Sequence, residues 1–230
     1  MPSTELGTVI VTGGSRGLGR AVVGAVADAG GTPLVLDIAE PERDAAWRQV
    51  DLADSRAAGR ATAQLIEDHG GVDAVVTAAG IDACGDLLDV HPEDWERVIA
   101  VNLVGTAAVV RAALPTLIER RGRVVTVAST LGLRALPAAT AYSASKFGVV
   151  GFTRALSTEL AGRVGVTLLL PGGMRTGFFD DRPERFKPAA DQQLNDPADV
   201  ADAVVYALRQ PPGCEVRELL IAPATEPSWP

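Results

Sequence analysis

Short apolar runs alternate along the chain with longer stretches in which apolar and small residues recur at helical spacing. The runs predict strands, several of them without polar interruption, as is typical of parallel strands covered on both faces; they span Thr8–Thr12, Pro33–Asp37, Arg48–Asp51, Ala74–Thr77, Arg123–Ala128, Gly165–Leu170 and Val216–Ile221. The stretches between them predict helices over Leu18–Ala29, Arg56–His69, Pro92–Arg120, Ala141–Ala161 and Pro197–Arg209. This alternation predicts right-handed crossovers and an α/β fold with a doubly wound parallel sheet of about seven strands.

The chain shows no internal repeat, low-complexity segment or linker, so we expect one domain covering residues 1–230. Its one long irregular stretch is 172–196, where an aromatic pair is followed by mixed charges. An irregular segment of that length in a compact domain is usually a lid or a binding loop. Ligands of doubly wound sheets bind beyond the carboxyl ends of the strands, so we expect the site there, with this segment beside it.

A glycine-rich turn, Thr12–Gly19, follows the first apolar run and precedes the first predicted helix. Its glycines allow a sharp turn and a close approach of the backbone to a pyrophosphate, whose charge the free amides at the helix start attract. The spacing leaves three residues between Gly13 and Gly17, unlike the usual G-x-G-x-x-G pattern. The context of strand, turn and helix nevertheless predicts a dinucleotide site.

Asp37 ends the second predicted strand, 18 residues after Gly19. A carboxylate there accepts hydrogen bonds from both hydroxyls of an adenosine ribose and repels a 2′-phosphate, which favours NAD. Arg16 inside the glycine turn favours NADP, because a cation pairs with a 2′-phosphate. We give Asp37 more weight, since the end of that strand faces the ribose.

Tyr142 and Lys146 stand four residues apart in a predicted helix and therefore on one face of it. A cation beside a phenol lowers a pKa that is otherwise about 10, which would make Tyr142 a usable proton donor and acceptor near neutral pH. Together with the glycine turn, this pair predicts redox chemistry.

With these motifs the chain resembles the short-chain dehydrogenase/reductase family, in its shorter soluble subtype, over nearly its whole length. Asp51-Leu52 looks like the family's adenine-contacting pair, and Thr77–Gly80 stands where the family usually has Asn-Asn-Ala-Gly. Asn102 resembles the asparagine of the catalytic helix, and Ser129 precedes Tyr142 by 13 residues, as the family's serine does. The stretch from Pro171 to Thr176 resembles the segment that closes over the nicotinamide.

The resemblance implies a Rossmann-type fold and hydride transfer between a nicotinamide and a secondary alcohol or ketone carbon. Its implied catalytic residues are Asn102, Ser129, Tyr142 and Lys146. Tyr142 would transfer the proton and Ser129 would hold the substrate oxygen; Lys146 would lower the tyrosine pKa and bind ribose hydroxyls, and Asn102 would hold a water linking Lys146 to solvent. The implied cofactor-binding residues are Gly13, Ser15, Arg16, Gly17, Leu18, Gly19, Asp37, Asp51, Leu52, Ala79, Gly80, Tyr142, Lys146, Pro171, Gly172 and Thr176.

One departure from the family pattern concerns the strand bracing after the fourth predicted strand. Thr77 and Ala78 replace the two asparagines, so any amide bracing of the neighbouring strands is missing or is replaced by the Thr77 hydroxyl. We expect this to affect stability more than chemistry.

Composition predicts a soluble cytoplasmic protein. The N-terminus has no basic and apolar leader pattern, and no run of 18 uncharged apolar residues predicts a membrane span. Cys84 and Cys214 are isolated, which suits a reducing compartment, and two histidines without a ligand motif make a metal site improbable. A net charge of −8 disfavours nucleic acid as a partner.

The substrate class stays open between acyl thioesters, sugars or cyclitols, and secondary-metabolite ketones. Arg134, Arg175 and Arg182 are candidates for binding an acidic group. The candidates for an apolar lining are Leu131, Leu133, Leu136, Phe178 and Phe179. Small residues along 92–120 and 141–161, together with the family resemblance, predict a homodimer or homotetramer.

Two alternative functions remain. One is a catalytically silent NAD(P)-binding redox sensor, against which the complete Asn102, Ser129, Tyr142 and Lys146 set argues. The other is an epimerase or dehydratase on the same four residues, which is the weaker because related proteins of that kind usually carry a substantial C-terminal substrate domain.

Overall fold

The structure, a computed structural model, describes residues 6–226, so the ends of the predicted domain, 1–5 and 227–230, lie outside the described residues. Seven parallel strands pair in the order β3-β2-β1-β4-β5-β6-β7. They are β1 Thr8–Thr12, β2 Thr32–Asp37, β3 Ala46–Gln49, β4 Ala74–Thr77, β5 Arg123–Val127, β6 Gly165–Pro171 and β7 Glu218–Ile221. From β1 the chain builds the sheet towards β3 on one side, and from β4 it builds the sheet towards β7 on the other, as in a doubly wound sheet. The predicted Rossmann-type α/β fold is confirmed.

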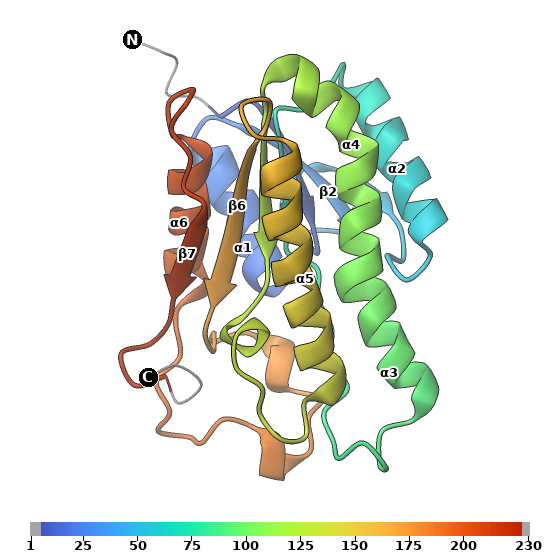
Figure 1. The fold of residues 1–230 in the computed structure, drawn as a ribbon, viewed down its shortest axis with the longest axis vertical. Helices are drawn as coiled ribbons and strands as arrows, with labels where there is room; N and C mark the ends of the chain where they lie inside the picture. The colour runs from blue at the N-terminus through green and yellow to red at the C-terminus, as the bar shows by residue number, and fades with distance from the viewer. Residues whose placement is uncertain (1–5, 227–230) are drawn as a thin grey trace.

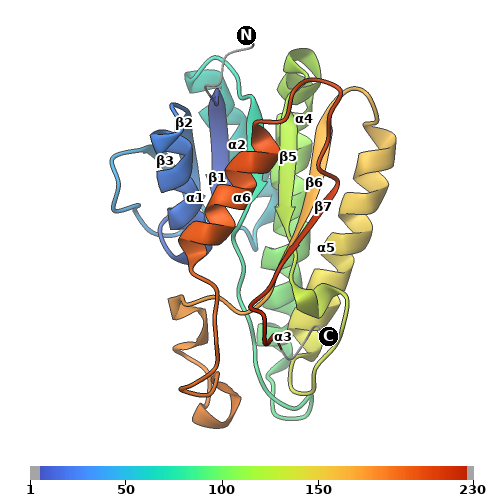
Figure 2. The same ribbon diagram turned by 90° about the vertical axis from the view of Figure 1, so that its left-hand side faces the viewer.

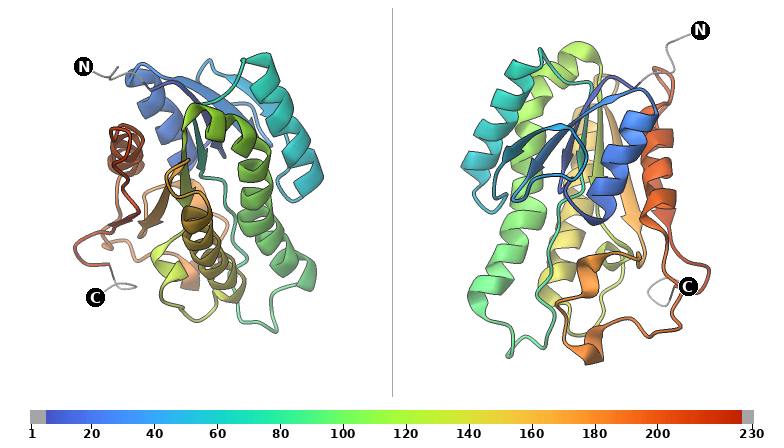
Figure 3. Two further views of the ribbon diagram at one scale, coloured as in Figure 1. Left: turned by 45° about the horizontal axis from the view of Figure 1, so that its top comes forward. Right: turned by 180° about the vertical axis from the view of Figure 1, so that it is seen from behind.

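Helices cover both faces of the sheet (Figures 1 and 2). The helices are α1 Gly17–Asp28, α2 Ser55–Asp68, α3 Pro92–Ile99, α4 Thr106–Arg120, α5 Thr140–Glu159 and α6 Pro197–Leu208. Helices α1 and α6 contact each other on one face (Figure 2), and α2, α4 and α5 lie on the other (Figure 3). The predicted helix positions are therefore confirmed, except that the stretch 92–120 is divided.

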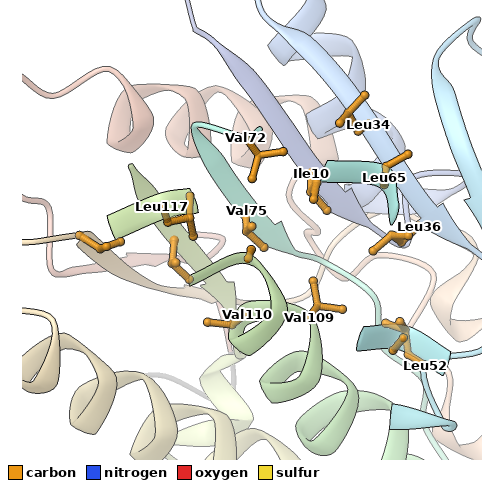
Figure 4. Close-up of a cluster of buried hydrophobic side chains, with 14 of the residues drawn as sticks. Ile10, Leu34, Leu36, Leu52, Leu65, Val72, Val75, Val109, Val110 and Leu117 are labelled. Atoms are coloured by element: carbon orange, nitrogen blue, oxygen red, sulfur yellow. The ribbon is translucent and has the colours of Figure 1, made fainter. Parts of the chain in front are cut away.

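Successive side chains along each strand point to opposite faces of the sheet, so a hydrophobic core forms on each face. Ile10 points into the cluster with α2, α4 and α5 (Figure 4), whereas its neighbours Val9 and Val11 point into the cluster with α1 and α6. All three are essentially inaccessible to solvent. Burial on both faces explains why the strands are apolar without interruption.

The third strand begins and ends two residues earlier than the predicted Arg48–Asp51. Its ladder runs from Leu34↔Ala46 to Asp37↔Gln49, and it stops because β2 ends at Asp37. Val50 leaves the ladder but still donates a backbone hydrogen bond to the Asp37 carbonyl, at 2.8 Å. The prediction placed the strand too late in the sequence because it included the apolar residue Val50.

The predicted helix 92–120 contains one turn of π-helix, Ala100–Gly105, between α3 and α4. By length and composition alone, Pro92–Arg120 is also apolar enough to cross a membrane, a test that core helices of soluble proteins pass as well. Here Val109, Val110 and Leu117 of this stretch pack against the sheet (Figure 4).

The carboxyl ends of the strands point towards the segment 172–196, which lies at the bottom of Figure 1. This segment contains two single turns of 3-10 helix, Gly177–Phe179 and Glu184–Phe186, and is otherwise irregular. The carboxyl ends of the strands and this segment are therefore neighbours, as expected.

Candidate functional site

The glycine turn joins β1 to α1 and is packed too closely for side chains. Gly13 has φ +71°, and a Cβ there would lie 2.7 Å from the Ala79 Cα. A Cβ on Gly19 would lie 2.0 Å from the Gly13 carbonyl oxygen. Arg16, at the N-cap of α1, makes no side-chain hydrogen bond to the first helical turn, so the first amides of α1 stay available to an anion.

Asp37 is buried at the end of β2 and holds the glycine turn in place. Its Oδ2 accepts from the Ser15 amide at 2.9 Å, and its Oδ1 accepts from the Ala39 amide at 3.2 Å. The Ser15 hydroxyl donates to the Ala39 carbonyl, so the turn and the end of β2 are linked twice. Arg16 is exposed beside them.

Asp51 and Leu52 follow β3, as expected. The Asp51 carboxylate accepts from the Ala53 amide at 2.9 Å and from Arg97 Nη2 at 2.7 Å. Partial burial raises the pKa of Asp51, but these two donors outweigh it and hold the pKa below its usual value. Leu52 is buried against Gly105 of the π-helical turn, where a Cβ would lie 2.7 Å from the Leu52 carbonyl oxygen.

Pro171, Gly172 and Thr176 leave the end of β6 and enter the segment 172–196. The Gly172 amide donates to the Ile221 carbonyl at 2.8 Å, which fixes the exit from the sheet. Thr176 caps the first 3-10 turn, and its Cβ lies 3.6 Å from where a Cβ on Gly17 would be. The structure therefore brings Thr176 beside the glycine turn, from a position 159 residues further along the chain.

Ser129, Tyr142 and Lys146 meet at the carboxyl end of β5. Ser129 follows β5, and its Oγ accepts from the Leu131 amide at 3.1 Å. The Ser129 hydroxyl also lies close enough to the Tyr142 side chain to lower the pKa of that tyrosine. Lys146 Nζ lies 5.5 Å from the centre of the Tyr142 ring and donates to the Val127 carbonyl at 2.8 Å. Helix α5 thus supplies the tyrosine and the lysine on one face, as their spacing predicted.

The expected lowering of the tyrosine pKa is not found. Burial raises the pKa of Tyr142 to about 12, although the nearby Ser129 hydroxyl acts in the opposite direction. Burial also lowers the pKa of Lys146 from 10.5 to about 8. The lysine is 4% exposed and turns its ammonium towards the Val127 carbonyl, so its charge is itself disfavoured and does little for the phenol.

Asn102 lies in the π-helical turn and clamps the connection after β4. Its Nδ2 donates to the Ile81 carbonyl and its Oδ1 accepts from the Ile81 amide, both at 2.9 Å. The same Nδ2 lies 3.0 Å from Ser145 Oγ, which donates to the Tyr142 carbonyl at 2.8 Å. A Cβ on Gly80 would lie 3.6 Å from both Asn102 Oδ1 and Lys146 Nζ, so these three residues are neighbours.

Of the two alternatives expected for the bracing of the strands after β4, the structure agrees with the first, in which the amide bracing is missing. The Thr77 hydroxyl is buried and makes no hydrogen bond within residues 6–226, so it does not replace an amide. The brace comes instead from Thr12 of β1, whose Oγ1 accepts from the Ala79 amide at 3.1 Å. The sequence did not predict this bracing role of Thr12, because no local pattern links Thr12 to Ala79.

The segment 172–196 places an aromatic side chain against the tyrosine. The rings of Phe178 and Tyr142 have centroids 5.5 Å apart, and Arg182 stacks on Phe178 and Phe179 at 5.3 and 4.7 Å. Arg182 also forms an ion pair with Asp82. Arg175 is exposed and lies 3.5 Å from Asp196, so of the arginines proposed as site residues only Arg182 lies against the tyrosine cluster by these contacts.

A cavity of about 700 Å³ lies between the segment 172–196 and the start of α6, with Thr176, Phe179, Lys187, Asn195 and Asp199 among its lining residues. It includes the predicted cofactor residue Thr176 and none of Ser129, Tyr142 or Lys146. The side-chain contacts of Tyr142 with Lys146 and Phe178, rather than cavity size, therefore mark the tyrosine cluster as the candidate catalytic site.

The fold is that of NAD(P)-dependent dehydrogenases. A sequence model described as short chain dehydrogenase matches residues 7–186, and the chain belongs to the short-chain dehydrogenase family. It is 29% identical over 216 residues to 3-oxoacyl-[acyl-carrier-protein] reductase FabG of Thermotoga maritima, covering 86% of this chain and 88% of that protein. It is 31% identical over 237 residues to glycine betaine reductase ATRR of Emericella nidulans, covering 95% of this chain but 19% of that longer protein.

Solved structures show the same fold. An alcohol dehydrogenase from Thermococcus sibiricus, complexed with 5-hydroxy-NADP, superposes with a TM-score of 0.84 at 24% identity and covers 94% of this chain and 96% of its own. The aldohexose dehydrogenase of Thermoplasma acidophilum in ligand-free form gives a TM-score of 0.86 at 24% identity, covering 95% of this chain and 93% of its own.

Proposed function

We propose that this protein is an oxidoreductase that transfers hydride between a nicotinamide cofactor and the carbon of a secondary alcohol or ketone, with Tyr142 as general acid and base. The observation that carries the proposal is the placement of Tyr142 with Lys146 one turn further along α5 and the Ser129 hydroxyl close by, at the carboxyl end of the sheet, where the glycine turn also lies. This juxtaposition joins residues from β1, β5 and α5, and a structural role alone does not require it.

The residues at the β1–α1 connection fit a dinucleotide. Gly13 and Gly19 leave a cradle that a Cβ would fill, and the uncapped amides of α1 suit a pyrophosphate. A bound nicotinamide dinucleotide supplies the site that accepts or releases hydride. The residues that would hold it are those expected from the sequence, with Asp37 on the ribose hydroxyls and Thr176 near the nicotinamide end.

The proton chemistry belongs to Tyr142 and its neighbours. With a pKa of about 12, Tyr142 carries its proton at neutral pH, which suits a donor to the alkoxide that forms during reduction. Ser129 offers a hydroxyl to the same oxygen and stabilises its growing charge. Lys146, whose pKa is about 8, exchanges its proton readily, and Asn102 lies next to Gly80 and Lys146 where a water would continue the path.

We further propose that the cofactor is NAD in preference to NADP. The support is the Asp37 carboxylate, which is buried at the end of β2 and fixed by two backbone amides. A 2′-phosphate at that position would meet a fixed negative charge, whereas Arg16 is exposed and makes no hydrogen bond that holds its guanidinium in the turn.

The remaining features of the proposal concern the working protein. We take the chain to act as one catalytic domain with the segment 172–196 as its lid, in the cytoplasm, on a small-molecule substrate, and as a homodimer or homotetramer. The support for the lid is the contact of Phe178 with Tyr142. The support for self-association is the exposed apolar surface of α5 and the π-helical turn.

The test of the function is Tyr142→Phe, with cofactor binding measured by calorimetry and turnover measured on secondary alcohols. We expect turnover to fall by about 10²-fold or more, because proton transfer by a positioned side chain contributes about 10²–10⁴-fold. Cofactor affinity should fall much less than turnover, since Tyr142 is only one of the residues expected to hold the cofactor and the phenyl ring keeps its packing against Phe178. A wild-type protein that binds neither NAD nor NADP would overturn the proposal, and one that binds NAD(P) without any turnover would favour a redox sensor.

A further inference from the structure

One ion pair beside the candidate catalytic site is buried on both sides. Arg182 Nη2 lies 2.5 Å from Asp82 Oδ2, and the two side chains are 17% and 5% exposed. In each of ten other ion pairs, at least one partner is far more exposed. Burial of a pair is costly, so its position calls for a physical reason beyond stability.

The pair belongs to the surroundings of Tyr142. Asp82 follows Ile81, whose backbone is clamped by Asn102, and Arg182 stacks on Phe178, whose ring packs on Tyr142. Both charges act on the phenol: Asp82 raises the pKa of Tyr142 and Arg182 lowers it. The pair is therefore linked to the Tyr142 ring through Phe178.

Two polar atoms of the pair are left over. Asp82 Oδ1 and Arg182 Nε are buried and make no hydrogen bond within residues 6–226. An unsatisfied buried polar group costs about 1–3 kcal/mol, and more when it is charged, so a ligand that hydrogen-bonds both atoms would relieve this cost. The pair thus offers one acceptor and one donor, and a hydroxyl group supplies one donor and one acceptor.

The charge of the pair excludes another class of ligand. The guanidinium of Arg182 is already neutralised by Asp82 and is further held by the Phe186 carbonyl, at 3.5 Å from Nη1. A carboxylate or phosphate entering here would meet the Asp82 carboxylate in a desolvated setting, where like charges repel strongly. Arg182 is therefore not a free receptor for an acidic group.

From these observations, and resting on the proposed oxidoreductase function, we propose that Asp82 and Arg182 are specificity-determining residues. They select an uncharged substrate that carries a second hydroxyl on the carbon next to the reacting one, as in a vicinal diol, a polyol or a sugar. Asp82 Oδ1 accepts from that hydroxyl and Arg182 Nε donates to it, while Ser129 and Tyr142 hold the reacting oxygen. Hydroxy acids are rejected.

The test compares three four-carbon secondary alcohols. The first, 2,3-butanediol, carries a second hydroxyl on the carbon next to the reacting one; 2-butanol lacks it; and 3-hydroxybutanoate carries a carboxylate one CH2 group away from the reacting carbon. Oxidation is followed with the preferred cofactor as kcat/KM. For wild type we expect the diol to exceed 2-butanol by about tenfold, the effect of one hydrogen bond to a charged group, and the hydroxy acid to be slowest. In Asp82→Asn the diol advantage should shrink towards unity, and the hydroxy acid should gain about tenfold relative to 2-butanol, because the charge of Arg182 is then unpaired.

The matched control is Asp89→Asn, in the same connection between β4 and α3 as Asp82. The Asp89 carboxylate lies 4.0 Å from Arg185 on the surface, and both side chains are about two-thirds exposed. It should leave all three ratios unchanged. If Asp82→Asn fails to fold, Arg182→Lys takes its place: lysine keeps the charge but lacks the Nε donor, so the diol advantage should fall without a gain for the hydroxy acid.

Three results would overturn the inference. They are an equal loss on all three alcohols in Asp82→Asn, which would mean that the pair only holds the segment 172–196; a wild-type preference for the hydroxy acid or for 2-butanol; and cofactor binding without turnover of the diol. Failure to bind any nicotinamide cofactor is a different result, since it would overturn the proposed function itself.

Discussion

At the residue scale, the candidate site uses side chains that hold the backbone and face a ligand at the same time. Asp37 accepts from the Ser15 and Ala39 amides, and Ser129 accepts from the Leu131 amide while it lies close enough to Tyr142 to lower the pKa of that tyrosine. Such bonds fix a side chain before any ligand arrives, so little conformational entropy is lost on binding. A substitution at these positions therefore affects both the local backbone and ligand binding, and only a comparison with a matched control variant separates the two effects.

Asp37→Ala should weaken NAD binding by about tenfold or more, because hydrogen bonds to a charged group contribute about 1.5–3 kcal/mol. Binding of NADP should weaken less or improve, since the charge that repels a 2′-phosphate is gone. Calorimetry with both cofactors measures this, with Asp44→Ala, an exposed aspartate in the next loop, as the control. Equal losses for NAD and NADP would show that Asp37 only supports the glycine turn.

At the element scale, tight local geometry decides where the site residues stand. The π-helical turn 100–105 interrupts the stretch 92–120 and puts Asn102 against Ile81, and such turns occur frequently at functional sites. The glycine turn brings the start of α1 against the connection after β4, with Gly13 next to Ala79. Both devices require close approach of backbone segments that are distant in the sequence.

Gly13→Ala should destabilise the protein by more than about 1 kcal/mol, since the left-handed conformation alone costs an alanine roughly that much and the added Cβ would collide with Ala79. Gly24→Ala, in the interior of α1, meets no atom within 4 Å and should stabilise it by about 0.5–1 kcal/mol. Denaturant unfolding of both variants measures the contrast. A neutral Gly13→Ala would mean that the turn is less tightly packed than the structure shows.

At the scale of the whole molecule, exposed apolar side chains gather on the face that carries α4 and α5. Phe147 of α5 is 47% exposed and Val104 of the π-helical turn is 43% exposed, and α4 and α5 run alongside each other in Figure 1. Small residues flank them, which allows helices of a second copy to approach closely. This surface supports the proposed self-association.

The protein is expected to sediment as a dimer or tetramer at micromolar concentration, and Phe147→Glu should reduce its mass, because it places a charge in the contact. Tyr206→Glu changes a 57% exposed aromatic residue of α6 on the opposite side of the sheet and should leave the mass unchanged. Sedimentation measures both. A monomeric wild-type protein would contradict the prediction.

The sequence by itself determined the fold and most of the candidate site. Uninterrupted apolar runs specify strands buried on both faces, and their alternation with helical patterns leaves few topologies, which is why the parallel sheet was predicted correctly. The spacing of Tyr142 and Lys146, and the position of Gly13 and Asp37 at strand ends, are local features that a periodic backbone converts directly into geometry.

Tertiary structure alone decided the features that depend on long-range packing. The pKa of Tyr142 rises because burial outweighs its neighbours, and a helical spacing cannot report burial. The brace from Thr12 to Ala79, the clamp of Asn102 on Ile81, and the pair of Asp82 with Arg182 join residues 67, 21 and 100 positions apart. No local sequence pattern encodes these contacts. They form because the sheet, the π-helical turn and the segment 172–196 pack together at the carboxyl ends of the strands.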